Sequence, residues 1–212
     1  MADKDNKDNK EKKQKITPKK KARVVDKWKL KNWYNIKAPE IFDGKEIGQL
    51  LSSDEENLNN RVIRIGLGEI TGSFTSSTAY TSVVFRVTGV SGKQVSTQFI
   101  GHELAPSYIK TLLRRRRSII YNVDDVKTTD GKELRIKTVS VTAFKVSEAV
   151  RKDLRAAIST HVKTIGGEMT LSALTQEVLF GKFAAKVFGK VKNLTPMRRL
   201  EIRKSELVEN FK

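Results

Sequence analysis

The stretch that decides the fold runs from Pro106 to Phe144, PSYIKTLLRRRRSIIYNVDDVKTTDGKELRIKTVSVTAF. Its Pro-Ser start is typical of a helix N-terminus, and the apolar residues that follow share one helical face: Ile109, Leu112 and Leu113. Arg114–Arg117 come directly after them. Four consecutive guanidinium groups at a helix end cannot all point one way, so some must reach outward for anions. Cations also suit the partial negative charge of a helix C-terminus, so the sequence predicts a short helix with a basic end.

Two β-rich runs follow the arginines. Ile119–Thr128 and Glu133–Phe144 are dominated by Val, Ile, Thr and Tyr, and the turn between them contains Asp130-Gly131, a hairpin signal. In the second run the apolar residues change parity, which predicts an extra residue, a β-bulge, near Lys137–Val139. Bulged, curved strands are typical of small closed barrels. The predicted fold is therefore α+β: an antiparallel β-barrel-like core flanked by helices, with a disordered basic N-terminal extension.

The length of 212 residues fits one domain with extensions. We expect residues 1–23 to be the basic disordered extension, because this lysine-rich segment has almost no apolar residues to offset the entropy of ordering. Residues 24–146 are expected to form the β-barrel-like core with one inserted helix. Residues 147–212 are expected to form C-terminal helices and a late strand that returns to the core.

Hydrophobic periodicity predicts the other elements. Arg61–Ile65 alternates as a strand, and Tyr80–Val87 and Lys93–Ile100 form a second hairpin. Asn35–Pro39 is expected to be extended and Glu46–Leu51 to form a short helical turn. The C-terminal elements are expected to be helices at Glu148–Lys163 and Thr170–Val187, with Thr170 as N-cap, and a strand at Leu200–Lys204.

The net charge is the strongest global property of the sequence. It is +18, with a pI near 10.0. Such an excess of positive charge destabilises a compact protein by self-repulsion unless a polyanion neutralises it, and nucleic acid is the commonest such partner. The alternative is a basic protein of the membrane surface, which would normally carry a lipidation signal or an amphipathic helix with an apolar face.

Composition also limits the compartment and the chemistry. The sequence has no cysteine, which excludes disulfides, a thiolate nucleophile and a cysteine-based zinc site. It begins without the apolar region of a secretory signal, and no apolar run approaches the roughly 18 residues of a membrane-spanning helix. We expect a soluble intracellular protein.

Three groups of residues are candidates for RNA binding. The first is the lysine-rich tail, which either threads between phosphates or only aids solubility. The second interleaves cations with aromatic rings; Trp28 either stacks on unpaired bases or packs in the core, whereas we expect Trp33 or Tyr34 in the core. The third comprises the arginine run and the basic face of the last predicted helix. The candidates are Lys12, Lys13, Lys15, Lys19, Lys20, Lys21, Arg23, Lys27, Trp28, Lys29, Lys31, Arg114, Arg115, Arg116, Arg117, Lys182, Lys186 and Lys190.

No motif supports catalysis or a cofactor. Gly66, Gly68 and Gly72 lack the spacing of a dinucleotide loop and no helix pattern follows them, so turns or bulges are expected. His102 beside Glu103 could act as a base, but a lone histidine next to glutamate is usually a surface residue. Asp124-Asp125 does not predict a metal site, because adjacent residues of a strand face opposite sides.

Two segments resemble a known family. Lys31–Pro39, KNWYNIKAP, is followed by Phe42 and Ile47-Gly48, and Asp125–Gly131, DVKTTDG, is followed by Leu134-Arg135. Together they resemble the small-subunit ribosomal protein family called S-three-a-e or eukaryotic-type S-one, found in archaea and eukaryotes. The resemblance spans roughly residues 20–204, and the short C-terminus and the lack of cysteine look more archaeal.

The resemblance implies a β-barrel core flanked by helices and a structural, non-enzymatic role in translation within a cytoplasmic ribonucleoprotein. The implied partners are small-subunit rRNA on the platform near the mRNA exit, neighbouring small-subunit ribosomal proteins and mRNA near that exit, with no membrane and no small-molecule substrate. Two alternatives remain open: an RNA-processing or ribosome-maturation enzyme that uses His102 and Glu103, and a chromatin-like DNA-binding protein. The partner of Arg114–Arg117 also remains open, since the family has more mixed residues there.

Overall fold

A computed structural model describes residues 26, 28–75 and 78–209 of the chain. Residues 1–30 and 31–212 form separate units. In the first unit Trp28–Leu30 form a turn, and the amide nitrogen of Trp28 donates to the carboxylate of Asp26 at 3.0 Å. The predicted disordered extension, residues 1–23, lies outside the described residues. The second unit holds all the helices and strands considered below.

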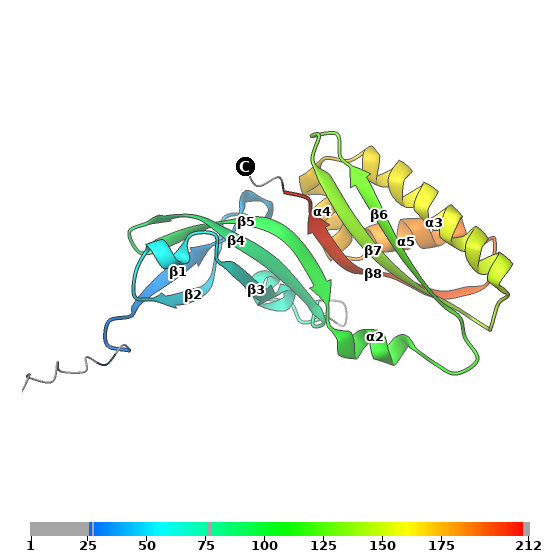
Figure 1. Cartoon of the computed structure of the whole chain (residues 1–212), viewed down its shortest axis with the longest axis horizontal. Coiled ribbons are helices and arrows are strands. Elements are labelled where there is room, and N and C mark those ends of the chain that lie inside the picture. The colour runs from blue at the N-terminus through cyan, green and yellow to red at the C-terminus, as the bar shows by residue number, and fades with distance from the viewer. Residues whose placement is uncertain (1–25, 27, 76–77, 210–212) are drawn as a thin grey trace, which may run out of the picture. The chain divides into compact units, whose positions relative to one another are not determined.

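The described residues form an eight-stranded sheet with the path β2-β1-β5-β8-β7-β6, and β4 pairs with both β3 and β5 (Figure 1). The pairs are antiparallel except β1 with β5. The strands are β1 Asn32–Lys37, β2 Glu46–Ser52, β3 Val62–Gly66, β4 Thr81–Ser91, β5 Gln94–Leu104, β6 Ile119–Lys127, β7 Glu133–Thr142 and β8 Met197–Leu207. The predicted α+β class and the flanking helices are confirmed, but the sheet does not close, since β2 and β6, at the two ends of the path, do not pair with each other.

Helices follow or cover the strands. They are α1 Leu67–Thr71, α2 Pro106–Leu112, α3 Glu148–Gly167, α4 Leu171–Leu179 and α5 Lys182–Val191, with short 3-10 turns at Glu40–Phe42 and Glu56–Leu58. The three C-terminal helices pack on β6, β7 and β8 around one hydrophobic cluster that includes Leu134, Ile136 and Leu154. Figure 1 shows α3 running alongside β6. Burying each such side chain contributes about 1.5–3 kcal/mol, which fixes the helices to the sheet.

A second hydrophobic cluster belongs to β1–β5. At its centre Phe85 of β4 is fully buried and meets the ring of Phe42 edge to face, at 5.6 Å between ring centroids. Tyr34, at 4% exposure, also belongs to this cluster, whereas Trp33 is 60% exposed. The prediction that one of these two aromatic residues lies in the core is therefore confirmed for Tyr34. The domain boundary predicted at residue 146 stays a prediction.

Both predicted hairpins are confirmed. The β4–β5 hairpin buries Val95, Thr97 and Phe99 on one face of β5, and Asp130-Gly131 lies in the turn of the β6–β7 hairpin. The strand predicted at Arg61–Ile65 is β3, and the late strand is β8. The extended segment at Asn35–Pro39 is confirmed over its β1 part.

Three local predictions were wrong. Residues Glu46–Leu51 belong to strand β2 and not to a helical turn, because they pair with β1. The single helix predicted over Thr170–Val187 is two helices, since Gly181 adopts a left-handed conformation with φ of 72° that ends the first one. The predicted cap survives, because the hydroxyl oxygen of Thr170 accepts from the amide of Ala173 at 3.4 Å. The glycine run encloses the five-residue helix α1, with Gly66 and Gly72 as its two caps, and the hydrophobic pattern did not predict this helix.

The predicted bulge lies at the right position but in the neighbouring strand. β7 pairs with β6 in unbroken register, whereas its ladder with β8 shifts between Lys137 and Thr138, which face Lys204 and Ile202. The extra residue is therefore Arg203 of β8. The change of parity in β7 has another cause: its residues from Thr138 to Thr142 are buried on both faces of the sheet.

Candidate nucleic-acid interface

The four arginines lie beyond helix α2 and not on it. The helix ends at Leu112, and Leu113 has extended backbone, with ψ of 120°. Arg114–Arg117 therefore form the turn that leads into β6, in which Arg116 has a left-handed φ of 62°. The prediction that these arginines form a basic helix end is wrong, because the helix ends before them. The interaction of a charge with the helix dipole fades beyond the last helical turn, so it does not hold them. Arg114, Arg115 and Arg116 are exposed and Arg117 is half-buried.

Hydrogen bonds join this turn to the loop between β7 and α3. The amide of Ser118 donates to the hydroxyl of Thr142 at 3.0 Å, and the amide of Thr142 donates to the carbonyl of Ser118 at 3.0 Å. The amide of Val146 donates to the hydroxyl of Ser118 at 3.1 Å. The amide of Ala143 in turn donates to the carbonyl of Pro196, between α5 and β8, at 2.9 Å. Three connections, residues 113–118, 143–147 and 192–196, thus meet at one end of the β6–β8 ladder.

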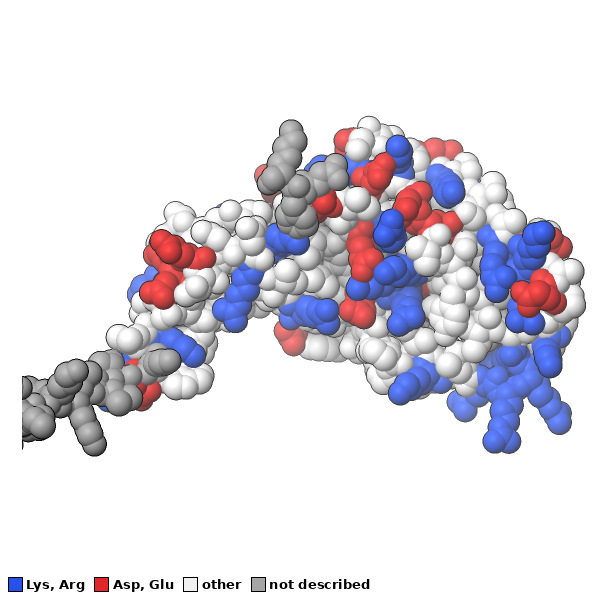
Figure 2. Space-filling view, viewed as in Figure 1, with Lys and Arg blue, Asp and Glu red and all other residues white. Residues whose placement is uncertain are grey.

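The three connections, together with residues 190–191 and 197–199 on either side of the third, contain cations and no carboxylates. We call residues 113–118, 143–147 and 190–199 the cationic end. Its cations are Arg114, Arg115, Arg116, Arg117, Lys145, Lys190, Lys192, Arg198 and Arg199. Among the described residues only Arg199 has a carboxylate partner, Glu201 at 2.7 Å. Figure 2 shows a dense group of Lys and Arg side chains where Figure 1 draws the connection from α2 to β6.

This end combines residues that are far apart in the sequence. The arginine run and Lys190 were predicted as separate candidates, and the fold brings their segments together. Lys145, Arg198 and Arg199 were missed, because each is a short cationic interruption of an apolar pattern. Only the hydrogen bonds between the loops identify them as one group.

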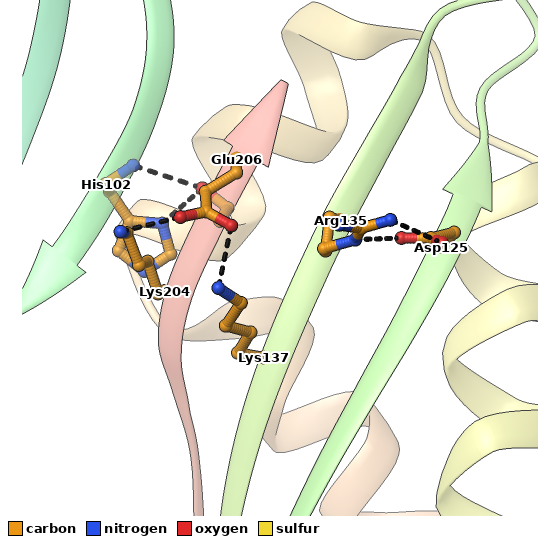
Figure 3. Close-up of polar contacts among 7 residues, drawn as sticks. His102, Asp125, Arg135, Lys137, Lys204 and Glu206 are labelled. Carbon is orange, nitrogen blue, oxygen red and sulfur yellow. Dashed lines mark hydrogen bonds and ion pairs between the residues drawn. The ribbon is translucent and has the colours of Figure 1, made fainter. Parts of the chain in front are cut away.

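Four cations on the open face of the β6–β8 ladder have carboxylate partners. Lys127 pairs with Glu133 at 3.0 Å and Arg135 with Asp125 at 2.7 Å. Lys137 and Lys204 both pair with Glu206, at 2.8 and 2.6 Å (Figure 3). Hydrogen bonding from Arg135 lowers the pKa of Asp125, and hydrogen bonds first from Lys137 and then from Lys204 lower the pKa of Glu206. This face leaves little charge for an external anion, in contrast to the cationic end.

The remaining predicted candidates are dispersed. On α5, Lys182, Lys186 and Lys190 are exposed, but Lys186 pairs with Glu177 at 2.5 Å. Trp28 is 68% exposed and Lys29 is exposed, while Lys31 is half-buried and belongs to the other unit. The other candidates lie outside the described residues: Lys12, Lys13, Lys15, Lys19, Lys20, Lys21, Arg23 and Lys27.

His102 is a buried residue of the sheet, so the expectation of a surface histidine was wrong. Its exposure is 2%, its Nδ1 lies 2.5 Å from the hydroxyl of Ser205, and its Nε2 lies 3.3 Å from the carbonyl of Ile202. Burial lowers the pKa of His102 from 6.5 to about 4, opposed by the hydrogen bond to Ile202. Glu103 is paired instead with Arg64, at 3.7 Å. The two residues therefore do not form an acid–base pair.

Two aspartates have structural roles. Asp124 is buried, accepts from Asn122 at 2.7 Å and from the hydroxyl of Ser159, whereas Asp125 is exposed, so the two face opposite sides as predicted. Asp130 was missed: its carboxylate accepts from the amide of Leu171, at the first turn of α4, at 2.7 Å. The acidic residue of the hairpin turn thus holds the start of a helix about forty residues later, which sequence spacing does not indicate.

The residues that the structure describes contain neither a metal-binding cluster nor a membrane-spanning helix. No group of three or more His, Asp or Glu side chains in this part of the chain could hold a metal ion. No helix within it is long and apolar enough to cross a membrane.

Comparisons with known proteins agree with the sequence resemblance. A family model described as the Ribosomal S3Ae family matches residues 19–210. The small ribosomal subunit protein eS1 of Sulfurisphaera tokodaii is 34% identical over 189 residues, which cover 89% of this chain and 97% of that protein. Proteins of the same name from Desulfurococcus amylolyticus and Methanothermobacter thermautotrophicus are 33% identical over 193 and 190 residues. They cover 91% and 90% of this chain, and 90% and 96% of their own lengths. The archaeal relatives confirm the predicted resemblance, and the chain belongs to the Ribosomal S3Ae family, whose members are structural proteins of the ribosome and not enzymes.

Proposed function

We propose that the protein is a structural constituent of the small ribosomal subunit and that its cationic end binds small-subunit rRNA. The relatives carry small-subunit names, and the protein resides in the small subunit in the cytoplasm. The observation that carries the RNA contact is the set of cations at the cationic end, of which only Arg199 is paired with a described carboxylate. The finer assignment is the platform near the mRNA exit, with neighbouring ribosomal proteins and mRNA as further partners.

In the proposed binding mechanism, cations held in place by the sheet recognise RNA phosphates. Guanidinium groups make charge-assisted, partly bidentate hydrogen bonds to phosphate oxygens. Side chains cannot read the deep major groove of A-form RNA, so phosphate and shape contacts dominate. The hydrogen bonds among Ser118, Thr142 and Val146 hold the arginine turn on the sheet, so its cations lose less entropy on binding. The lysines predicted to bind RNA from the tail add phosphate contacts that do not depend on these hydrogen bonds.

The test replaces Arg114–Arg117 by alanine in the full chain and measures RNA affinity against salt concentration. Each lost phosphate contact lowers the salt slope by roughly 0.7–0.9, so four lost contacts lower it by about 3. The matched control replaces four cations that already have carboxylate partners, Lys127, Arg135, Lys137 and Lys204, by glutamine. This control removes the same formal charge, so it corrects for the long-range field.

The proposal predicts a much larger loss of slope in the arginine variant than in the control. Equal slopes and affinities for the arginine variant and the unchanged protein in filter binding would contradict it. Structured small-subunit RNA should also be preferred over duplex DNA at matched salt, and the reverse preference would favour the chromatin-like alternative.

A further inference from the structure

A groove lies between α5 and the first half of β8. Its volume is about 390 Å³, within the range of about 300–1,000 Å³ usual for sites of small ligands. The lining residues from the helical side are Phe180, Gly181, Ala184, Ala185 and Phe188, and those from the strand are Arg198, Arg199, Leu200 and Glu201. The groove is thus apolar on its helical side and charged on its strand side.

The helical side offers aromatic rings above a floor of small residues. Gly181, Ala184 and Ala185 leave room beside the strand, and Ala184 itself is buried. Phe180 sits at the end of α4, where the left-handed Gly181 redirects the chain, and is 47% exposed. Phe188 packs partly against the core and also lines the groove. An exposed ring beside small residues offers a flat apolar surface on which another ring can stack.

The strand side is an edge segment of β8. β5 pairs with β8 only through Lys204, Ser205 and Glu206. From Met197 to Arg203, β8 therefore has the β7 ladder on one side and no described strand on the other. Leu200 and Glu201 of this edge segment line the groove, and a strand edge without a neighbouring strand can offer backbone groups to a ligand.

The charge of the groove favours an anionic occupant. Arg198 has no carboxylate partner among the described residues, and it belongs to the cationic end. Arg199 pairs with Glu201 at 2.7 Å and lies 5.9 Å from the ring centroid of Tyr108, so it is already held. The groove is therefore continuous with the proposed phosphate-binding surface, with Arg198 at the junction.

We propose that this groove holds one unpaired nucleotide of the bound RNA, with its base stacked on Phe180 and Phe188 and its phosphate against Arg198. Aromatic rings, polar backbone edges and a free guanidinium are the groups that hold single-stranded nucleotides. The inference rests on the proposed function and adds a single-stranded subsite to a surface that otherwise recognises phosphates.

The test uses the full chain and two RNA hairpins of equal length, one fully paired and one with a single unpaired 5-iodouridine in the stem. The unchanged protein should prefer the second hairpin by roughly ten-fold, as base stacking on one aromatic residue allows. Irradiation should cross-link the iodouridine within residues 180–188. Phe180→Ala should bring the preference close to one and abolish the cross-link, without changing the affinity for the paired hairpin.

Two further variants separate stacking from folding. Phe180→Trp keeps a ring at this position and should retain the preference. Phe74→Ala removes another exposed phenylalanine, 76% exposed, outside the groove, and should change neither quantity. A Phe180→Ala protein that keeps both the preference and the cross-link would overturn the subsite, even if Arg114–Arg117 still set the salt slope. If the unchanged protein binds neither hairpin, both the subsite and the proposed RNA contact are wrong.

Discussion

His102 shows how a residue with catalytic chemistry becomes a structural one. It is enclosed where β5 meets β8, with the hydroxyl of Ser205 on one ring nitrogen and the carbonyl of Ile202 on the other. Both contacts come from β8, about a hundred residues later in the chain. In the sequence His102 stands beside Glu103, and the local pattern does not indicate that it is buried. Its burial depends on the pairing of β5 with β8.

The buried histidine predicts a pH dependence of stability. The folded pKa is about 4 and the ordinary value is 6.5, so between these values the unfolded chain binds more protons. The contribution of neutral, buried His102 to the free energy of unfolding is fully present above about pH 6.5 and is lost as the pH falls toward 4. Through His102 alone, the free energy of unfolding should be lower by about 2 kcal/mol at pH 5 than at pH 7.

Urea unfolding of His102→Gln at pH 7 and pH 5 checks this prediction. The variant should lose most of the pH difference attributed to His102, whereas His161→Gln on α3 should keep the difference of the unchanged protein. If His102→Gln shows the same pH difference as the unchanged protein, protonation of this residue is not the cause.

At the scale of elements, the local patterns predicted the hairpins and the terminal strand, since each depends on neighbours in sequence. The local patterns failed where pairing with a segment distant in the sequence determines the secondary structure. Glu46–Leu51 has no strict alternation, and only its pairing with β1 makes it a strand. The parity change in β7 predicts an extra residue in that strand, but the extra residue belongs to β8, and burial of β7 on both faces explains the pattern.

The junction of β5 and β8 provides a test at this scale. A Cβ atom at Gly101 would lie 2.1 Å from the backbone carbonyl oxygen of Ser205, so any side chain there must push the strands apart. Gly101→Ala should destabilise the protein by about 3 kcal/mol or more, because the obstructing atom is backbone. Gly89→Ala in β4, where nothing lies within 4 Å of the added atom, is the matched control. Equal urea midpoints for the two variants would show that the strands are not so close.

The turn between β6 and β7 provides another test. Asp130 accepts from the amide of Leu171 at 2.7 Å and so adds a second capping contact to that of Thr170 at the start of α4. Asp130→Ala should cost about 0.5–2 kcal/mol, the usual cost of losing a cap. Asp130→Asn keeps an acceptor oxygen and should cost less. The measurement is urea unfolding at pH 7, and a stability of Asp130→Ala equal to that of the unchanged protein would contradict the capping role.

At the scale of the whole molecule, the sequence gives the amount of positive charge and the structure gives its distribution. The +18 net charge predicted a polyanionic partner. Which cations are available follows only from the fold, since Asp125, Glu133 and Glu206 pair with four cations on the open face of the β6–β8 ladder. The cationic end lacks such partners except at Arg199. The candidate site was thus predictable at Arg114–Arg117, but not its extension to Lys145 and Arg198.

The most direct test of the central claim is sedimentation of the full-length protein with purified ribosomal subunits. The small subunits should first be stripped of their own copy of the protein, and large subunits at the same salt serve as the control. We predict that the protein travels with the small subunit alone and remains bound through a high-salt wash. Protein that stays at the top of the gradient in the presence of stripped small subunits, or that binds both subunits equally, would contradict a place in the small ribosomal subunit.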